Sequence, residues 1–178
     1  SKKLFKKDYS YFSSYSTTWL KHSENLVKTL IKKLELKKNS KIVELASNDG
    51  YLLQYFKKKG FDCLGFEPTL NTAKVARKKG IKVINQFFSK KIGEKFYKNK
   101  FDLLLGLNVV AHVSNINDFI TGIKIVLKDD GFGNLIDTTL TTLSVDRKDI
   151  ALDLNFDPLY NQVDKKIFSA YSLNSLAD

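Results

Sequence analysis

Short apolar runs rich in β-branched residues alternate with stretches of helical spacing through the middle of the chain. The apolar runs predict five strands, at residues 41–46, 61–67, 81–84, 102–108 and 132–136. The stretches between them predict helices at residues 50–59, 70–79, 90–96 and 116–127, the last capped by Ser114 or Asn115 and ended by the Asp-Asp-Gly at 129–131. Regular alternation of strand and helix favours right-handed βαβ units. The predicted fold class is therefore α/β, a mostly parallel twisted sheet with helices on both faces.

The same pattern divides the chain into three parts. Residues 1–38 are a predicted N-terminal helical segment, built on an amphipathic helix over residues 17–36. Residues 39–138 form the predicted sheet domain. Residues 139–178 carry no clear period, so we place no elements there and expect either part of the same domain or a lid.

Composition narrows the possible partners. The 178 residues are 43% hydrophobic and 28% charged, as in globular proteins. The net charge of +11 invites a nucleic-acid partner, but only Arg77 and Arg147 among the 30 basic residues are arginine. Proteins that bind phosphates and read bases rely on the bidentate arginine fork, so a nucleic-acid partner is not favoured.

Cysteine content and hydropathy exclude further classes. One cysteine, Cys63, cannot form a disulfide framework or a cysteine-rich zinc module, and we expect no metal site. No apolar run reaches the roughly 18 residues that span a bilayer, and the basic start lacks the apolar region of a signal peptide. We therefore expect a cytoplasmic protein with no membrane partner.

Polar residues at two predicted strand ends indicate the ligand, because open parallel sheets bind ligands at the carboxyl ends of their strands. The turn from Glu44 to Gly50 lacks the G-x-G-x-x-G pattern that brings backbone amides to a pyrophosphate, which argues against a nicotinamide cofactor. An acid followed by small residues suits a ligand with a cationic amine instead. Glu67, which ends the second strand, is placed to accept hydrogen bonds from two ribose hydroxyls. The two ends together fit S-adenosyl-L-methionine (SAM).

The string VELASNDGYLL at residues 43–53 resembles motif I of class I SAM-dependent methyltransferases. More narrowly, it is similar to the nucleotide-sugar C-methyltransferases, whose motif reads VEIGSNDGYLL. The likeness covers most of residues 9–136 and includes these strings: YFSSY at 11–15, WLKH at 19–22, GFEP at 65–68, NQFF at 85–88 and NVVAHV at 108–113. The resemblance implies a Rossmann-like class I methyltransferase fold, with residues 39–138 as the SAM-binding domain. It also implies a small-molecule acceptor such as a nucleotide-linked keto-sugar.

Carried over by position, the resemblance implies a set of cofactor-binding residues: Glu44, Ala46, Ser47, Asn48, Asp49, Gly50, Glu67, Pro68, Phe87, Phe88 and Asn108. Glu44 and the turn after it would hold the methionine part, and Glu67 the ribose. Pro68 would pack near the adenine, with Phe87 or Phe88 flanking it, and Asn108 would lie beneath the methyl group.

The resemblance to the family is weaker at the catalytic residues than at the cofactor-binding residues. Carbon methylation beside a ketone needs a base to form the enolate. The family's FDxIYHEH signature, which supplies the base, resembles only FDPLY at 156–160, and neither possible alignment places a histidine after it. His112 matches an active-site histidine of the family, whereas His22 reads as a surface or packing residue. Tyr11 and Tyr160, with Tyr15, are candidates to orient the acceptor or polarise its keto oxygen.

Other departures keep alternatives open. Ala46 stands where the motif has its first glycine, which would hinder the close approach of the cofactor. The family's cysteine-rich zinc segment and its C-terminal domain have no counterpart in these residues. We therefore predict a SAM-dependent methyltransferase without the family's base. The alternatives are a catalytically impaired SAM-binding protein or partner subunit, and an RNA methyltransferase. The oligomeric state is not predicted.

Overall fold

A six-stranded sheet in the order β3-β2-β1-β4-β5-β6 forms the centre of the molecule, in a computed structural model that describes residues 11–136 and 143–146. Strands β1 to β5 are parallel, and β6 pairs with β5 in the antiparallel direction. The strands are β1 (Lys41–Leu45), β2 (Asp62–Phe66), β3 (Lys82–Ile84), β4 (Phe101–Leu107), β5 (Leu127–Ile136) and β6 (Leu143–Asp146). The predicted mostly parallel sheet is confirmed. Strand β6 lies where the sequence shows no clear period.

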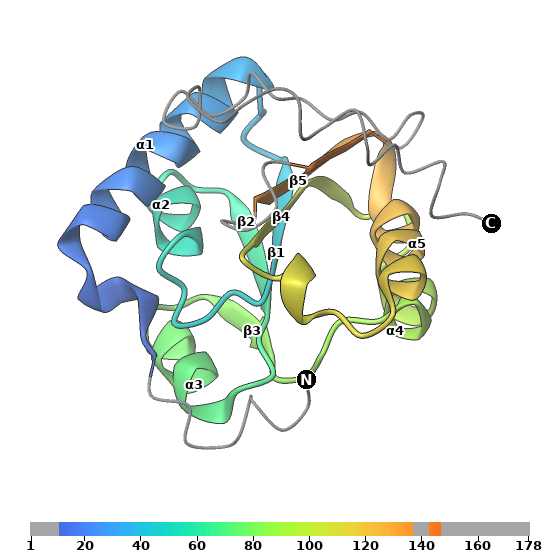
Figure 1. Cartoon of the computed structure of the whole chain (residues 1–178). Coiled ribbons are helices and arrows are strands. Elements are labelled where there is room, and N and C mark those ends of the chain that lie inside the picture. Colours follow the sequence, from blue (N-terminus) through green and yellow to red (C-terminus); the bar gives the residue numbers. More distant parts are fainter. Residues whose placement is uncertain (1–10, 137–142, 147–178) are drawn as a thin grey trace, which may run out of the picture.

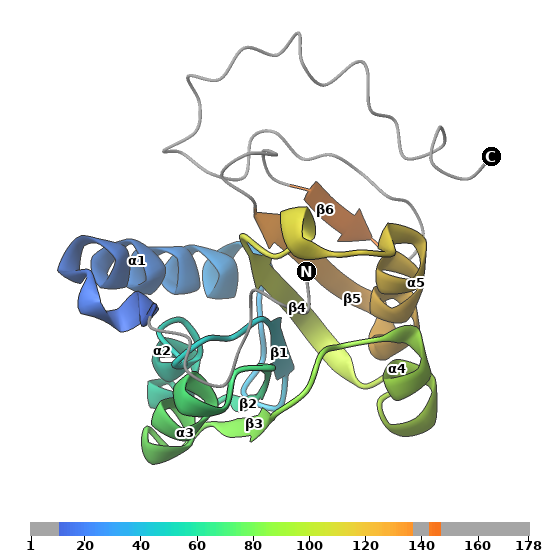
Figure 2. The same cartoon turned by 60° about the horizontal axis from the view of Figure 1, so that its bottom comes forward.

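Helices cover both faces of this sheet, as predicted (Figure 1). Figure 2 shows α1, α2 and α3 on one face and α4 and α5 on the other. The helices are the 3₁₀ turn η1 (Ser13–Tyr15), α1 (Thr17–Lys33), α2 (Leu53–Lys58), α3 (Leu70–Lys78), α4 (Lys90–Phe96), the 3₁₀ turn η2 (Val110–His112) and α5 (Ile116–Val126). Within the described residues, none of these helices has the length and apolar character needed to cross a membrane.

Two apolar cores form because alternate strand residues point to opposite faces. On β1, Ile42 packs with Val27 and Leu30 of α1, whereas Val43 packs with Ile123 of α5. All five side chains are fully buried, and each such burial stabilises the fold by about 1.5–3 kcal/mol. Since α1 shares its core with the sheet, the N-terminal helix is held firmly beside the strands. The division of the chain at residues 38 and 138 stays a prediction.

Three predicted boundaries differ from the structure by three or more residues, two for local reasons and one because of strand pairing. Helix α1 ends at Lys33 rather than 36, where Glu35 adopts a left-handed φ of 46°. Helix α2 begins at Leu53 rather than 50, because Gly50 has a φ of 75° that a helix cannot contain. Strand β5 begins at Leu127 rather than 132, and its pairing with β4 shifts register between Phe101 and Leu103. A register shift of this kind gives no signal in a hydropathy pattern.

The loop after β1 has an unusual backbone. Ala46, Asn48 and Gly50 have φ angles of 56°, 49° and 75°, so alternate residues are left-handed. Glycine takes this conformation freely and asparagine tolerates it, but an alanine pays a steric cost of about 1–2 kcal/mol. The motif's glycine therefore suits position 46 because of the backbone angle, and Ala46 is strained.

We predict that Ala46→Gly stabilises the protein. Relief of the left-handed strain, less the entropy that glycine adds to the unfolded chain, should raise the free energy of unfolding by about 0.5–1 kcal/mol. The melting temperature should then rise by about 1–4 °C in calorimetry. Ala73→Gly is the matched control. Ala73 is buried in the helix α3, so the same substitution should destabilise there by about 1 kcal/mol or more. A fall in melting temperature for both variants would contradict the strain at Ala46.

Candidate cofactor site

A cavity of about 730 Å³ opens at the carboxyl ends of the strands, a size typical of small-molecule sites, which span roughly 300–1,000 Å³. Leu45, Phe66 and Leu107, at the ends of β1, β2 and β4, form part of its lining. Strand β1 lies between β2 and β4, so the chain reverses direction across the sheet at this point. Open sheets bind their ligands at such a switch point.

Most of the sequence-predicted site residues line this cavity. They are Tyr11, Ala46, Asn48, Glu67, Pro68, Phe87, Phe88, Asn108 and His112. Four others do not reach its lining: Glu44 on β1 and Ser47, Asp49 and Gly50 in the loop after it are all buried. Tyr160 lies outside the described residues.

Glu67 is a buried acid of the cavity that is fixed by two backbone hydrogen bonds. It is 4% exposed, and its two carboxylate oxygens accept hydrogen bonds from the backbone N–H groups of Asn48 and Thr69, each at 2.8 Å. Burial raises the pKa of Glu67, and these backbone bonds oppose the shift. A carboxylate has about four lone-pair positions, so both oxygens can accept further hydrogen bonds from a ligand. The geometry fits the ribose-binding role expected from the sequence.

Glu44 lies behind the cavity rather than at its surface. It is fully buried, and within the described residues neither of its carboxyl oxygens has a hydrogen-bond partner. Burial, with smaller effects from the charges of Glu67 and Asp49, holds the pKa of Glu44 well above its usual range. The neighbouring Tyr51 hydroxyl partly opposes this shift without meeting the geometry of a hydrogen bond. Three carboxyl groups thus share this end of the cavity.

The charge of the cavity is opposite in sign to that of the chain. Glu67 and Asp118 line it, and no lysine or arginine does among the residues the structure describes, although the chain has 30 of them. A cavity with this lining favours a cation, such as a sulfonium or an ammonium group, over a phosphate. The lining residues therefore fit SAM, and the positive charge of the chain does not extend into the cavity.

Aromatic side chains form one wall. Phe87 is 43% exposed, and Phe88 packs edge-on against Phe66 and Phe119 with ring centroids 5.3 and 6.0 Å apart. An exposed ring beside a packed one can flank a planar base. Phe87 and Phe88, the two candidates from the sequence, therefore both line the cavity where an adenine could pack against them.

The end of β4 carries the candidate base. Asn108 turns the chain with a φ of 54°, and the 3₁₀ turn η2 then places the exposed His112 at the cavity. His22 instead stacks on Trp19 at 5.2 Å on helix α1, in agreement with a packing role.

Several lining residues were missed by the sequence reasoning: Trp19, Tyr51, Gln86, Asn115, Asp118 and Phe119. Trp19, Tyr51 and Gln86 lie inside strings that resemble the family, so the likeness could have found them. For Asp118 and Phe119, the sequence pattern indicated only positions in the first turn and on the apolar face of α5, with no sign of a ligand site. Asn115, one of the two predicted caps, does cap that helix, since its side chain accepts a hydrogen bond from the Asp118 N–H at 3.0 Å.

A family model described as "Methyltransferase domain" matches residues 19–178. The chain belongs to this methyltransferase family. The C-methyltransferase NovU of Streptomyces niveus is 28% identical over 125 residues, which are 69% of this chain and 30% of NovU. The predicted class of SAM-dependent methyltransferases is confirmed, and SAM is the cofactor that membership implies.

Solved structures agree in fold. The PH0226 protein of Pyrococcus horikoshii superposes with a TM-score of 0.59 at 19% identity, over 71% of this chain and 57% of its own. A TehB-like SAM-dependent methyltransferase of Corynebacterium glutamicum gives 0.50 at 16% identity, over 68% and 72%. The predicted Rossmann-like methyltransferase fold is confirmed. The chain spans less than a third of NovU and just over half of PH0226.

We predict that Glu44 makes stability fall as the pH rises. Its pKa is raised in the folded protein, so the folded state holds this proton more tightly than the unfolded chain, whose carboxyl titrates near 4.5. The stabilising contribution is complete below that value and is lost as the pH rises through the folded pKa. Glu44→Gln removes the titration, so its free energy of unfolding should improve relative to wild type between pH 5 and pH 8, measured by urea denaturation.

The exposed Glu94, paired with Lys90 at 3.7 Å on helix α4, supplies the control Glu94→Gln. Its denaturation curves should keep a constant offset from wild type across this pH range. A constant offset for Glu44→Gln as well would show that Glu44 is not buried as a carboxyl group.

Proposed function

We propose that the chain binds SAM in this cavity and transfers its methyl group to a small-molecule acceptor. Glu67 carries the proposal, because a buried acid at the end of β2 with free lone pairs suits a ribose diol. Pro68 and Phe87 would flank the adenine. The carboxylate of Glu67 in the cavity, with Glu44 buried behind it, would favour the cationic methionine part.

The acceptor we propose has a neutral reacting end, such as the sugar ring of a nucleotide-linked keto-sugar. This choice follows the resemblance to sugar C-methyltransferases and suits a lining that, in the described residues, includes no lysine or arginine. NovU is itself named a C-methyltransferase, which supports carbon as the acceptor atom.

Methyl transfer to such a carbon has two requirements. A base first takes the proton beside the keto group, and the enolate carbon then bonds to the methyl carbon as the carbon–sulfur bond breaks, leaving neutral S-adenosylhomocysteine. The transfer itself needs mainly alignment and exclusion of water. We assign the role of the base to His112, which is exposed and lines the cavity, as Asn108 does. Tyr11 can orient the acceptor.

The first test is calorimetric titration with S-adenosylhomocysteine, with NADH as the control ligand. Binding of S-adenosylhomocysteine alone is expected. Binding of NADH, or of neither ligand, would contradict the proposed cofactor site.

Glu67→Gln should weaken S-adenosylhomocysteine binding by about 10- to 100-fold, because it removes a charged acceptor from the ribose. The same titration measures the loss. Asp62→Asn on the same strand, exposed and paired with Lys82 at 3.1 Å, should bind as wild type does. Equal affinities for wild type and Glu67→Gln would place the ribose elsewhere.

His112→Ala should slow methyl transfer to a nucleotide-linked keto-sugar by about 10²–10⁴-fold, the usual contribution of a general base. The S-adenosylhomocysteine affinity should stay within about twofold of wild type, and the release of S-adenosylhomocysteine with time gives the rate. An unchanged rate would exclude His112 as the base. Absence of turnover in wild type, with cofactor binding intact, would favour the impaired SAM-binding alternative.

A further inference from the structure

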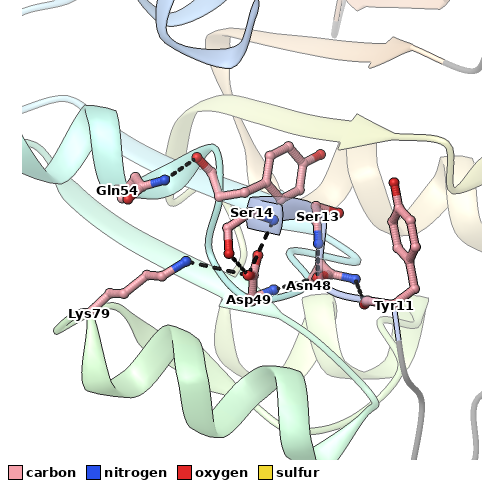
Figure 3. Close-up of polar contacts among 8 residues, drawn as sticks. Tyr11, Ser13, Ser14, Asn48, Asp49, Gln54 and Lys79 are labelled. Carbon is pink, nitrogen blue, oxygen red and sulfur yellow. Dashed lines mark hydrogen bonds and ion pairs between the residues drawn. The ribbon is translucent and has the colours of Figure 1, made fainter. Parts of the chain in front are cut away.

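The N-terminal residues Tyr11 to Ser14 lie against the cofactor loop, although some 35 positions separate them in the sequence. The Asn48 side chain makes the first attachment (Figure 3). Its Oδ1 accepts a hydrogen bond from the Ser13 N–H at 3.1 Å, and its Nδ2 donates to the Tyr11 carbonyl at 3.1 Å.

Asp49 makes the second attachment. Its Oδ2 accepts hydrogen bonds from the Ser14 N–H at 3.3 Å and from the Ser14 hydroxyl, and the Lys79 ammonium at the end of α3 lies 3.5 Å away. Asp49 is fully buried and does not line the cavity. Asp49 can therefore act on a ligand through the residues that it holds or through its charge, and Ser14→Ala, which keeps the charge, separates the two.

The residues held in this way are part of the cavity wall. Tyr11 and Ser13 both line the cavity, and the Asn48 N–H binds the Glu67 carboxylate at 2.8 Å. The loop after β1 thus holds both Glu67, through the Asn48 N–H, and residues 11–14, through the side chains of Asn48 and Asp49. A ligand bound to Glu67 would therefore share the cavity with Tyr11 and Ser13.

We propose that Asp49 is a positioning residue that fastens residues 11–14 over the bound cofactor and thereby slows its release. The proposal rests on the proposed cofactor site. Hydrogen bonds to a charged acceptor are among the stronger ones in proteins, so loss of this attachment should speed dissociation by about tenfold.

Trp19 supplies the signal for the test. It is the chain's single tryptophan, it lines the cavity, and its ring centroid lies 6.0 Å from that of Tyr51. Stopped-flow fluorescence can therefore follow the binding and release of S-adenosylhomocysteine.

Three variants are compared with wild type. Ser14→Ala removes the donor hydroxyl from the half-buried Ser14, and Asp49→Asn removes the charge with little change of shape. Asp62→Asn is the matched control, because it removes an exposed carboxylate of β2 that does not line the cavity. Thermal unfolding verifies that each variant folds, and Ser14→Ala suffices for the test if Asp49→Asn does not fold.

Ser14→Ala and Asp49→Asn should each release S-adenosylhomocysteine about tenfold faster, with association rates within about twofold of wild type and no change in the control. The double variant should release it no faster than Asp49→Asn, since both changes break one contact. Wild-type release rates, a loss confined to association, or additive effects in the double variant would each overturn the role of Asp49. These results would leave the cofactor site standing, whereas a wild type that does not bind S-adenosylhomocysteine would overturn both proposals.

Discussion

The hydrogen bond from the Asn48 N–H to the Glu67 carboxylate joins the first two strand ends of the sheet, and the candidate site depends on it. It forms because Asn48 adopts a left-handed φ of 49°, which aims its backbone N–H across to β2 while its side chain faces the N-terminal residues. Ala46 and Gly50 share the left-handed conformation on either side. The loop therefore holds Glu67, the proposed ribose ligand, in a fixed position, and Ala46 is strained in the same loop.

The cavity is lined by acidic residues, whereas the chain as a whole is basic. The chain has a net charge of +11, yet the buried Glu67 lines the cavity, and Glu44 and Asp49 are buried without reaching it. Burial, and to a lesser degree repulsion by Glu67 and Asp49, raises the pKa of Glu44, and a cationic ligand would oppose that shift. The same arrangement disfavours a pyrophosphate, because its charge would meet carboxylates rather than cations.

Family membership and the catalytic assignment stand on different observations. Membership rests on a match over residues 19–178 and on a sheet order that places the strand ends around one cavity. The assignment of a base rests on one observation. Of the two histidines that the structure describes, His112 lines the cavity, whereas His22 is stacked on Trp19. The cofactor half of the site is consequently better defined than the acceptor half.

The sequence by itself determined the order of β1 to β5 and of α1 to α5 along the chain, the acids at the ends of β1 and β2 and the family. Hydropathy period and short contiguous motifs report these local features, and the parallel sheet follows from the alternation of strand and helix. Tertiary structure decided that Glu44 lies behind the cavity, that Asp118 and Phe119 of α5 reach it, and that Asn48 and Asp49 hold residues 11–14. It also decided where β5 begins, through a register shift against β4. These features depend on contacts between residues tens of positions apart, and such contacts form only when packing of the two cores fixes the distance between strand ends.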